Sequence, residues 1–145
     1  MSSISETWGT TQDERQRPFP CDDIISEPDA ELYRGITINA LPETVFRWLC
    51  QLRVAPYSYD WIDNFGRQSP RELTPGLDFL AVGQDVMRIF NLVAFEQDRQ
   101  LTIRVKPHSN AFKTFGDVRI SYLVVPIVDR PASECRLLVK LVVKY

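Results

Sequence analysis

The sequence predicts an α+β fold in which an antiparallel sheet follows two early helices. Apolar residues alternate with polar ones over 100–106, and over 134–145 every second residue from Cys135 to Val143 is apolar; this is the period of a strand with one better-buried face. Residues 41–52 instead carry apolar side chains at helical spacing, and Pro42 and Glu43 suit the first turn of a helix.

The remaining elements follow from the same two periods and from turn residues between them. In chain order we expect a strand over 34–38, helices over 41–52 and 57–65, a loop over 67–83, strands over 85–89, 90–97 and 100–106, a polar loop over 107–115, and strands over 116–126 and 134–145. Strands joined by short turns form a meander. We assign the scattered glycines, Gly35 and Gly116 among them, to turns.

Charge divides the 145 residues into two parts. Residues 1–30 carry a net charge of −5 and residues 31–145 carry +3, which gives −2 for the whole chain. We expect residues 1–29 to be an acidic N-terminal tail, partly extended or disordered, with Trp8 and Phe19 as anchors on the domain formed by 30–145. A body with so small a positive charge predicts no nucleic-acid partner.

Cysteines and the N-terminus set the expected compartment. The three cysteines are widely spaced and include no CxxC pair, which predicts reduced thiols and neither disulfides nor a zinc site. The first residues lack a basic and apolar leader, so we expect a cytoplasmic protein. The apolar runs fall short of the roughly 20 residues that a membrane-spanning helix needs.

Three stretches resemble the START-like, or SRPBCC, superfamily, in the subgroup of uncharacterised bacterial proteins. The first is Ile-Thr-Ile-Asn-Ala-Leu-Pro-Glu-Thr-Val-Phe-Arg-Trp-Leu at 36–49, the second is Tyr-Ser-Tyr-Asp-Trp-Ile-Asp-Asn at 57–64, and the third is Leu-Ala-Val-Gly-Gln-Asp-Val at 80–86. The resemblance covers about residues 30–145. The superfamily includes polyketide cyclase/dehydrase-like proteins and lipid-transfer domains.

The resemblance implies a helix-grip fold, in which a curved antiparallel sheet wraps around a long C-terminal helix and encloses an apolar cavity. This chain stops at Tyr145, inside an apolar strand, so we expect that long helix to be missing. An apolar sheet face of several hundred Å² left in water would forgo on the order of 10 kcal/mol. We therefore expect either that a partner, such as a second copy in a homodimer, covers that face, or that the sequence is a truncated form of a longer protein.

The candidate ligand-binding residues are aromatic and polar residues that the helix-grip fold would place around its cavity: Trp48, Tyr57, Tyr59, Asp60, Trp61, Arg88, Phe90 and Tyr122. Rings would contact an apolar ligand, while hydroxyls and Asp60 would hold its polar end. The alternative is that these rings pack in the core and the acids are solvated. Catalytic residues are not identified.

Other titratable residues give weaker indications. Arg104 alternates with apolar neighbours, which indicates an outward position, and His108, the single histidine, sits in the polar loop. Asp60 and Asp63 lie three apart on the second helix, and nothing in the sequence separates their pKa values as an acid/base pair requires.

These observations predict a protein that binds a small apolar or amphipathic, lipid- or polyketide-like ligand between sheet and helices. One alternative is a cyclase/dehydrase-like enzyme that uses an acid or base in the cavity. Another is a non-catalytic protein-interaction domain. No GxGxxG, P-loop, HExxH or GxSxG motif occurs, and we expect no cofactor and no metal.

Overall fold

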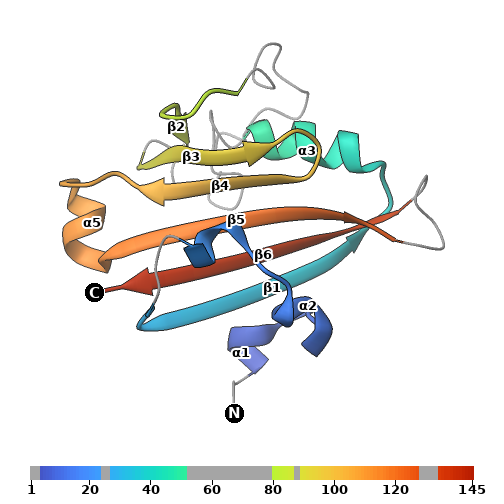
Figure 1. Ribbon diagram of the computed structural model, residues 1–145, viewed down its shortest axis with the longest axis horizontal. Helices are drawn as coiled ribbons and strands as arrows, with labels where there is room; N and C mark the ends of the chain where they lie inside the picture. Colours follow the sequence, from blue (N-terminus) through green and yellow to red (C-terminus); the bar gives the residue numbers. More distant parts are fainter. Residues whose placement is uncertain (1–3, 24–26, 52–79, 87–88, 128–133) are drawn as a thin grey trace, which may run out of the picture.

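The described residues of the computed structural model build one six-stranded antiparallel sheet with short helices on both of its faces (Figure 1). The structure describes residues 4–23, 27–51, 80–86, 89–127 and 134–145. The elements are α1 (Ile4–Thr7), α2 (Gln12–Gln16), η1 (Pro20–Asp23), β1 (Ala30–Ile38), α3 (Pro42–Cys50), β2 (Asp85–Val86), β3 (Phe90–Glu96), β4 (Gln100–Val105), α5 (Asn110–Phe115), β5 (Asp117–Pro126) and β6 (Cys135–Lys144). The expected α+β class is confirmed, and the curved sheet fits a helix-grip arrangement.

The strands β2 to β6 form a meander, to which β1 is added at one edge. The order is β1-β6-β5-β4-β3-β2, so the last five strands follow one another as expected, and β1 pairs with β6. That pairing runs from Ala30 opposite Val143 to Ile38 opposite Cys135. The first and last strands are therefore neighbours, and β1 lies at the edge of the sheet. The expected helix over 57–65 lies outside the described residues.

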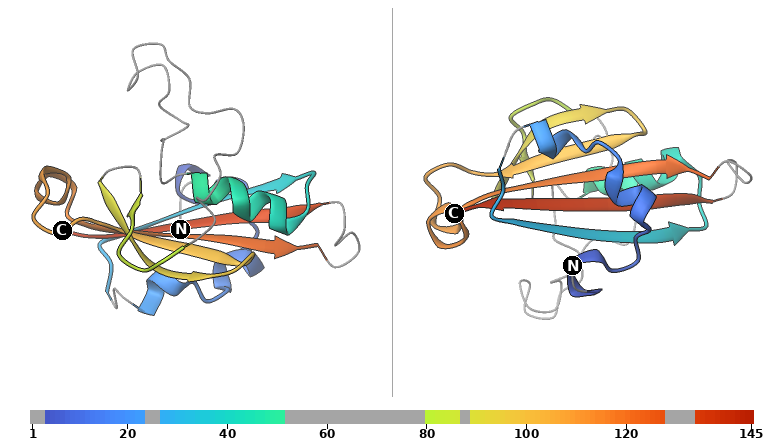
Figure 2. Two further views of the ribbon diagram at one scale, coloured as in Figure 1. Left: turned by 90° about the horizontal axis from the view of Figure 1, so that it is seen from above. Right: turned by 60° about the horizontal axis from the view of Figure 1, so that its bottom comes forward.

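Helix α3 forms where the sequence predicts a helix. Leu41 is its N-cap, Pro42 follows in the first turn, and Glu43 lies at the positive end of the helix dipole. Val45, Phe46, Leu49 and Cys50 are buried on one side of this helix. Figure 2 shows α3 lying across one face of the sheet, which we call the helix face.

The expected polar loop over 107–115 is partly wrong, because α5 occupies its second half. Ser109 caps this helix: its Oγ accepts a hydrogen bond from the Phe112 N–H at 3.0 Å. Gly116 ends the helix with a φ of 85°, a conformation that favours glycine. Phe112 packs against the core and so fixes the helix to the sheet.

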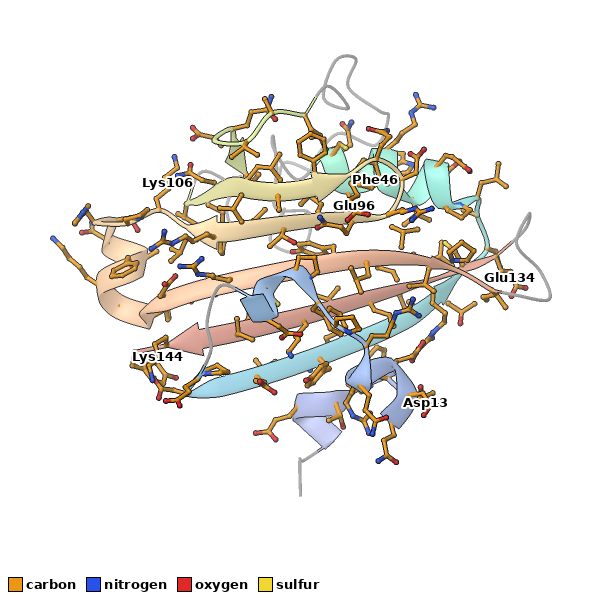
Figure 3. The ribbon with its side chains drawn as sticks, in the orientation of Figure 1. Asp13, Phe46, Glu96, Lys106, Glu134 and Lys144 are labelled. Atoms are coloured by element: carbon orange, nitrogen blue, oxygen red, sulfur yellow. The ribbon has the colours of Figure 1, made fainter. Side chains whose placement is uncertain are left out.

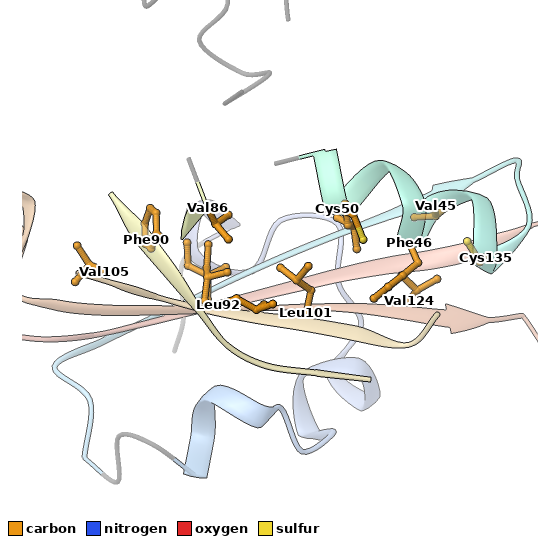
Figure 4. Close-up of a cluster of buried hydrophobic side chains, with 13 residues drawn as sticks. Val45, Phe46, Cys50, Val86, Phe90, Leu92, Leu101, Val105, Val124 and Cys135 are labelled. Atoms are coloured by element: carbon orange, nitrogen blue, oxygen red, sulfur yellow. The ribbon is translucent and has the colours of Figure 1, made fainter. Parts of the chain in front are cut away.

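The main core lies on the helix face. Buried residues of α3 meet those of the strands there, as Figure 4 shows for ten labelled side chains. Its members are Val45, Phe46, Leu49, Cys50, Val86, Phe90, Leu92, Leu101, Ile103, Val105, Ile120, Val124 and Cys135. At about 1.5–3 kcal/mol for each large side chain removed from water, this cluster is a main source of folding free energy.

A second, smaller core lies on the opposite face, which we call the N-terminal face. Phe19 and Cys21 pack there against Leu138 and Val142 of β6. Phe19, one suggested anchor, is 3% exposed, whereas Trp8, the other, is 55% exposed. Within the described residues 4–23, α2 and η1 thus lie against this face, whereas α1 lies beside β1 at the edge of the sheet (Figure 2). The division into tail and domain stays a prediction.

Two glycines allow the N-terminal segment to approach β1. The Gly35 N–H donates to the Trp8 carbonyl at 3.1 Å, and Gly9 has a φ of 75°. A Cβ on Gly9 would lie 2.0 Å from the Gly35 carbonyl oxygen, and a Cβ on Gly35 would lie 2.9 Å from the Gly9 oxygen. Gly35 therefore serves a close backbone contact inside β1, and its assignment to a turn is wrong.

Replacing Gly9 by Ala tests this contact. Gly83 is the matched control, because its φ is also positive, at 98°, but a Cβ there meets nothing within 4 Å. We expect Gly83→Ala to lower the free energy of unfolding by about 1 kcal/mol through backbone strain alone. Gly9→Ala should lower it by about 1–3 kcal/mol more, because atoms overlap. Equal losses in urea unfolding would contradict the close contact.

Candidate functional site

Three of the eight candidate ligand-binding residues lie in the described part of the chain. Phe90 is 9% exposed in the main core and faces Val105 and Val86 across the sheet. Trp48 is 36% exposed on α3. Tyr122 lies in the middle of β5 and packs against the main core. The other five candidates, Tyr57, Tyr59, Asp60, Trp61 and Arg88, lie outside the described residues, as does Asp63.

Tyr122 is a polar residue in an apolar row of the helix face. On one side it lies opposite Leu101 of β4, and on the other it lies opposite Val139 of β6. Burial among these side chains raises the pKa of the Tyr122 phenol to about 12. The hydroxyl is therefore protonated throughout the physiological range and can donate a hydrogen bond.

Arg34 extends the same row to the sheet edge and was not among the candidates. It lies opposite Val139 on β1, so one valine separates it from Tyr122 across the sheet. One terminal nitrogen donates to the Tyr33 carbonyl at 2.7 Å, and the side chain is exposed. The sequence did hold a signal for it, because Arg34 is in phase with Ile36 and Ile38, which place it on their face.

Apolar side chains surround these two polar groups. We call them the apolar strip, which consists of Ile36, Leu137, Val139 and Leu141. Ile36 is 50% exposed, and the three β6 residues are half-buried. They are adjacent because Ile36 lies opposite Leu137. The strip and the two polar groups together can accept a molecule with an apolar body and a polar end.

A groove of about 600 Å³ lies elsewhere, where the β3–β4 turn meets α3 and the residues before η1. Its lining residues are Arg17, Pro18, Pro20, Pro42, Glu43, Glu96, Gln97, Asp98, Arg99, Gln100, Leu123, Val124, Val125 and Pro126. None of the three described candidates, Trp48, Phe90 and Tyr122, lines this groove. Its rim carries charges of both signs, so it favours no single class of ligand by charge.

Lys140 is a buried cation on the N-terminal face, 5% exposed. Its Nζ pairs with the Asp22 carboxylate and lies 5.6 Å and 5.2 Å from the ring centres of Phe19 and Tyr33. Burial disfavours the charged form, but the hydrogen bonds with Asp22 and Tyr33 outweigh burial and raise the pKa of Lys140. This group holds the N-terminal segment on the sheet and is a structural contact.

A hydroxyl network lies beside Lys140 on the same face. Ser121 Oγ accepts a hydrogen bond from the Cys21 N–H at 2.9 Å and lies 2.9 Å from Thr102 Oγ1. The Thr102 hydroxyl also donates to Gln100 Oε1 at 2.8 Å. These contacts satisfy polar groups that the second core would otherwise bury without partners.

Arg136 makes the second charged contact with the N-terminal segment. Its guanidinium donates to both Glu14 carboxylate oxygens, at 2.9 Å and 2.8 Å, and to the Gly9 carbonyl at 2.6 Å. The hydrogen bond from Arg136 lowers the pKa of Glu14 and outweighs the effect of burial, which raises it. Fork-like pairing of this kind orients both groups.

The residues with weaker indications lie away from the strip. Arg104 is on the N-terminal face, with Nε 3.4 Å from Asp117 Oδ1, and His108 is exposed just before α5. Among the described residues, no group of three or more His, Cys, Asp or Glu residues is placed to hold a metal ion. None of the described helices has the length and apolar composition to cross a membrane.

No protein-family model matches the chain, and no curated protein matches it. Among solved structures it is similar to protein MLL2253 from Mesorhizobium loti, with a TM-score of 0.42 and 14% identity over 76% of this chain and 75% of that one. It is also similar to CalU16 from Micromonospora echinospora, with a TM-score of 0.45 and 11% identity over 79% of this chain. The match spans 60% of CalU16, less than two thirds of its length. Likenesses at these scores assign neither family nor function.

The lowered pKa of Glu14 predicts a specific dependence on pH. A carboxylate with a depressed folded-state pKa adds stability above its ordinary value of 4.5, and that stability is lost as the pH falls through the folded-state pKa. At pH 7 we expect Glu14→Gln to lower the free energy of unfolding by about 1 kcal/mol. The gap to the wild type should close as the pH drops below 4.5.

Urea unfolding between pH 7 and pH 3 measures this gap. Glu96→Gln is the control, because Glu96 is exposed at the end of β3. Its stability should follow the wild type over the whole range. A gap for Glu14→Gln that is independent of pH would show that the ion pair with Arg136 does not stabilise the fold.

Proposed function

We propose that the protein binds a small amphipathic molecule on the helix face, with its apolar body on the apolar strip and an anionic or polar end at Tyr122 and Arg34. The observation that supports this most directly is the row across β1, β6 and β5, in which one valine separates a guanidinium from a phenol. Polar groups set singly among apolar side chains are typical of ligand sites.

The expected contributions to the binding free energy agree with a site for an amphipathic ligand. Each Å² of apolar ligand surface that the strip covers contributes roughly 25 cal/mol, which is the main source of affinity. The phenol of Tyr122 donates a neutral hydrogen bond, and Arg34 adds a charge-assisted one. A carboxylate at the end of an apolar chain therefore fits better than a neutral hydroxyl. The ligand class is that of fatty acids and similar apolar acids.

The chemistry of the Tyr122 phenol and the Arg34 guanidinium favours binding of a ligand over catalytic turnover. A cyclase/dehydrase-like reaction needs a residue that removes a proton near neutral pH. Tyr122, with a pKa of about 12, stays protonated there, and the guanidinium of Arg34 carries N–H donors and no acceptor. They can bind and orient a ligand, and neither acts as a base. The homodimer and the interaction domain remain predictions, with the apolar strip as their contact surface.

Calorimetry with decanoate and decanol tests the proposed site. We expect decanoate to bind saturably at the apolar strip, and Tyr122→Phe to raise the Kd of that binding about three- to tenfold through loss of a hydrogen bond. Arg34→Gln should raise the Kd of decanoate by a similar factor and leave that of decanol unchanged, because only decanoate carries a charge.

The strip itself is tested with a charge. Ile36 is half-exposed, so Ile36→Lys folds, and it should raise the Kd of both probes about tenfold or more by placing an ammonium among apolar contacts. Val82→Lys is the matched control, since Val82 is 67% exposed before β2 and away from the strip. Equal effects of the two lysines would refute the site. If the strip instead joins two copies, Ile36→Lys should convert a dimer to a monomer in sedimentation.

A further inference from the structure

Two arginines lie directly opposite each other on the N-terminal face, at the end of the sheet where β4 meets α5. Arg104 of β4 is paired in register with Arg119 of β5. Like charges in directly opposed positions destabilise a sheet. Such a pair of arginines therefore needs negatively charged groups close by.

One carboxylate serves both guanidiniums. The Arg119 Nε and Nη2 atoms donate to the Asp117 oxygens at 3.3 Å and 3.0 Å, so that pair is bidentate. Arg104 has its Nε 3.4 Å from Asp117 Oδ1, and this contact is an ion pair without hydrogen-bond geometry. Among the residues that the structure describes, two positive charges thus face one negative charge, and one positive charge is in excess.

Arg104 holds an unused donor. Its Nε is buried without a hydrogen-bond partner. A buried donor without a partner loses roughly 1–3 kcal/mol unless water or an ion satisfies it. The side chain is 32% exposed, against 12% for Arg119 and 19% for Asp117. Arg104 is therefore the member that a ligand reaches from solvent.

Two lysines flank the arginine pair at the same end of the sheet. Lys106 Nζ lies 3.0 Å from Asp85, and Lys144 Nζ lies 3.6 Å from Asp29. Each of these lysines already has its own carboxylate. Figure 3 shows the molecule from the N-terminal face, with Lys106 and Lys144 labelled at the same end of the sheet, at the left. They add a flanking pair of cations and leave the excess charge on the arginines.

We propose that Arg104 and Arg119 form a binding site for an oxyanion with one negative charge, either a carboxylate or a phosphate diester. The anion lies against the terminal nitrogens of Arg104 and is steered by Arg119. Guanidiniums favour this chemistry because their planar fork matches two oxygens of a carboxylate or phosphate. The site lies on the opposite face from Tyr122 and the apolar strip, so it is separate from the ligand site proposed above.

Nuclear magnetic resonance of the arginine Nε–H groups tests the site on the intact chain. Acetate and dimethyl phosphate are the probes for the two kinds of oxyanion, and sodium chloride keeps the ionic strength constant. We expect a saturable shift of the Arg104 and Arg119 signals with at least one probe. Whichever probe binds more tightly identifies the group. No saturable shift with either probe would overturn the proposal.

Variants with opposite expected effects separate a site from general attraction to positive charge. Arg104→Gln should weaken binding about tenfold, as the Arg119 signal reports. Asp117→Asn should strengthen it about tenfold, because the competing carboxylate is removed. Arg99→Gln, an exposed arginine in the β3–β4 turn, is the control and should leave the Kd unchanged. Equal weakening by Arg99→Gln and Arg104→Gln, or no strengthening by Asp117→Asn, would refute the site.

Discussion

The register between β5 and β6 is the constraint on which the rest of the structure depends. It runs without a break from Asp117 opposite Lys144 to Pro126 opposite Cys135. Because successive side chains point to opposite faces, this register places Tyr122 and Val139 on the helix face and Ser121 and Lys140 on the N-terminal face. A slip by one residue would exchange the two sets. Both cores and both proposed sites would be lost together.

Two cations on the N-terminal face find their partners among the acids of residues 1–30. The register turns Arg136 and Lys140 toward that face, where Lys140 is almost fully buried. A buried ammonium without a partner is strongly unfavourable, and only a paired one is tolerated. Glu14 and Asp22 supply the partners from more than a hundred residues away. Two of the seven acids in residues 1–30, Glu14 and Asp22, thus pair with cations of β6.

The spacing of apolar residues and the helix-capping residues were enough to predict the meander and α3, because both signals are local to one strand or one helix. Helix α5 was missed because six residues are too short to show a period, although Ser109 and Gly116 marked its ends. The docking of Phe19 and the contact of Gly9 with Gly35 depend on residues far apart in the chain, which no local pattern reports. Arg34 had the right phase, but its place beside Val139 required the pairing of β1 with β6.

The two proposed sites share strand β5 and differ in what the described residues leave unsatisfied. On the helix face, apolar side chains remain partly exposed to solvent, since Ile36 is half-exposed beside half-buried residues of β6. On the N-terminal face the shortage is of negative charge, since Asp117 serves both Arg104 and Arg119. A sheet one layer thick keeps the two sets of side chains on opposite sides, so a ligand on one face does not displace the other. Changes at well-separated positions without shared partners add nearly independently. The two sites should therefore bind their ligands without competition, even when both ligands carry a carboxylate.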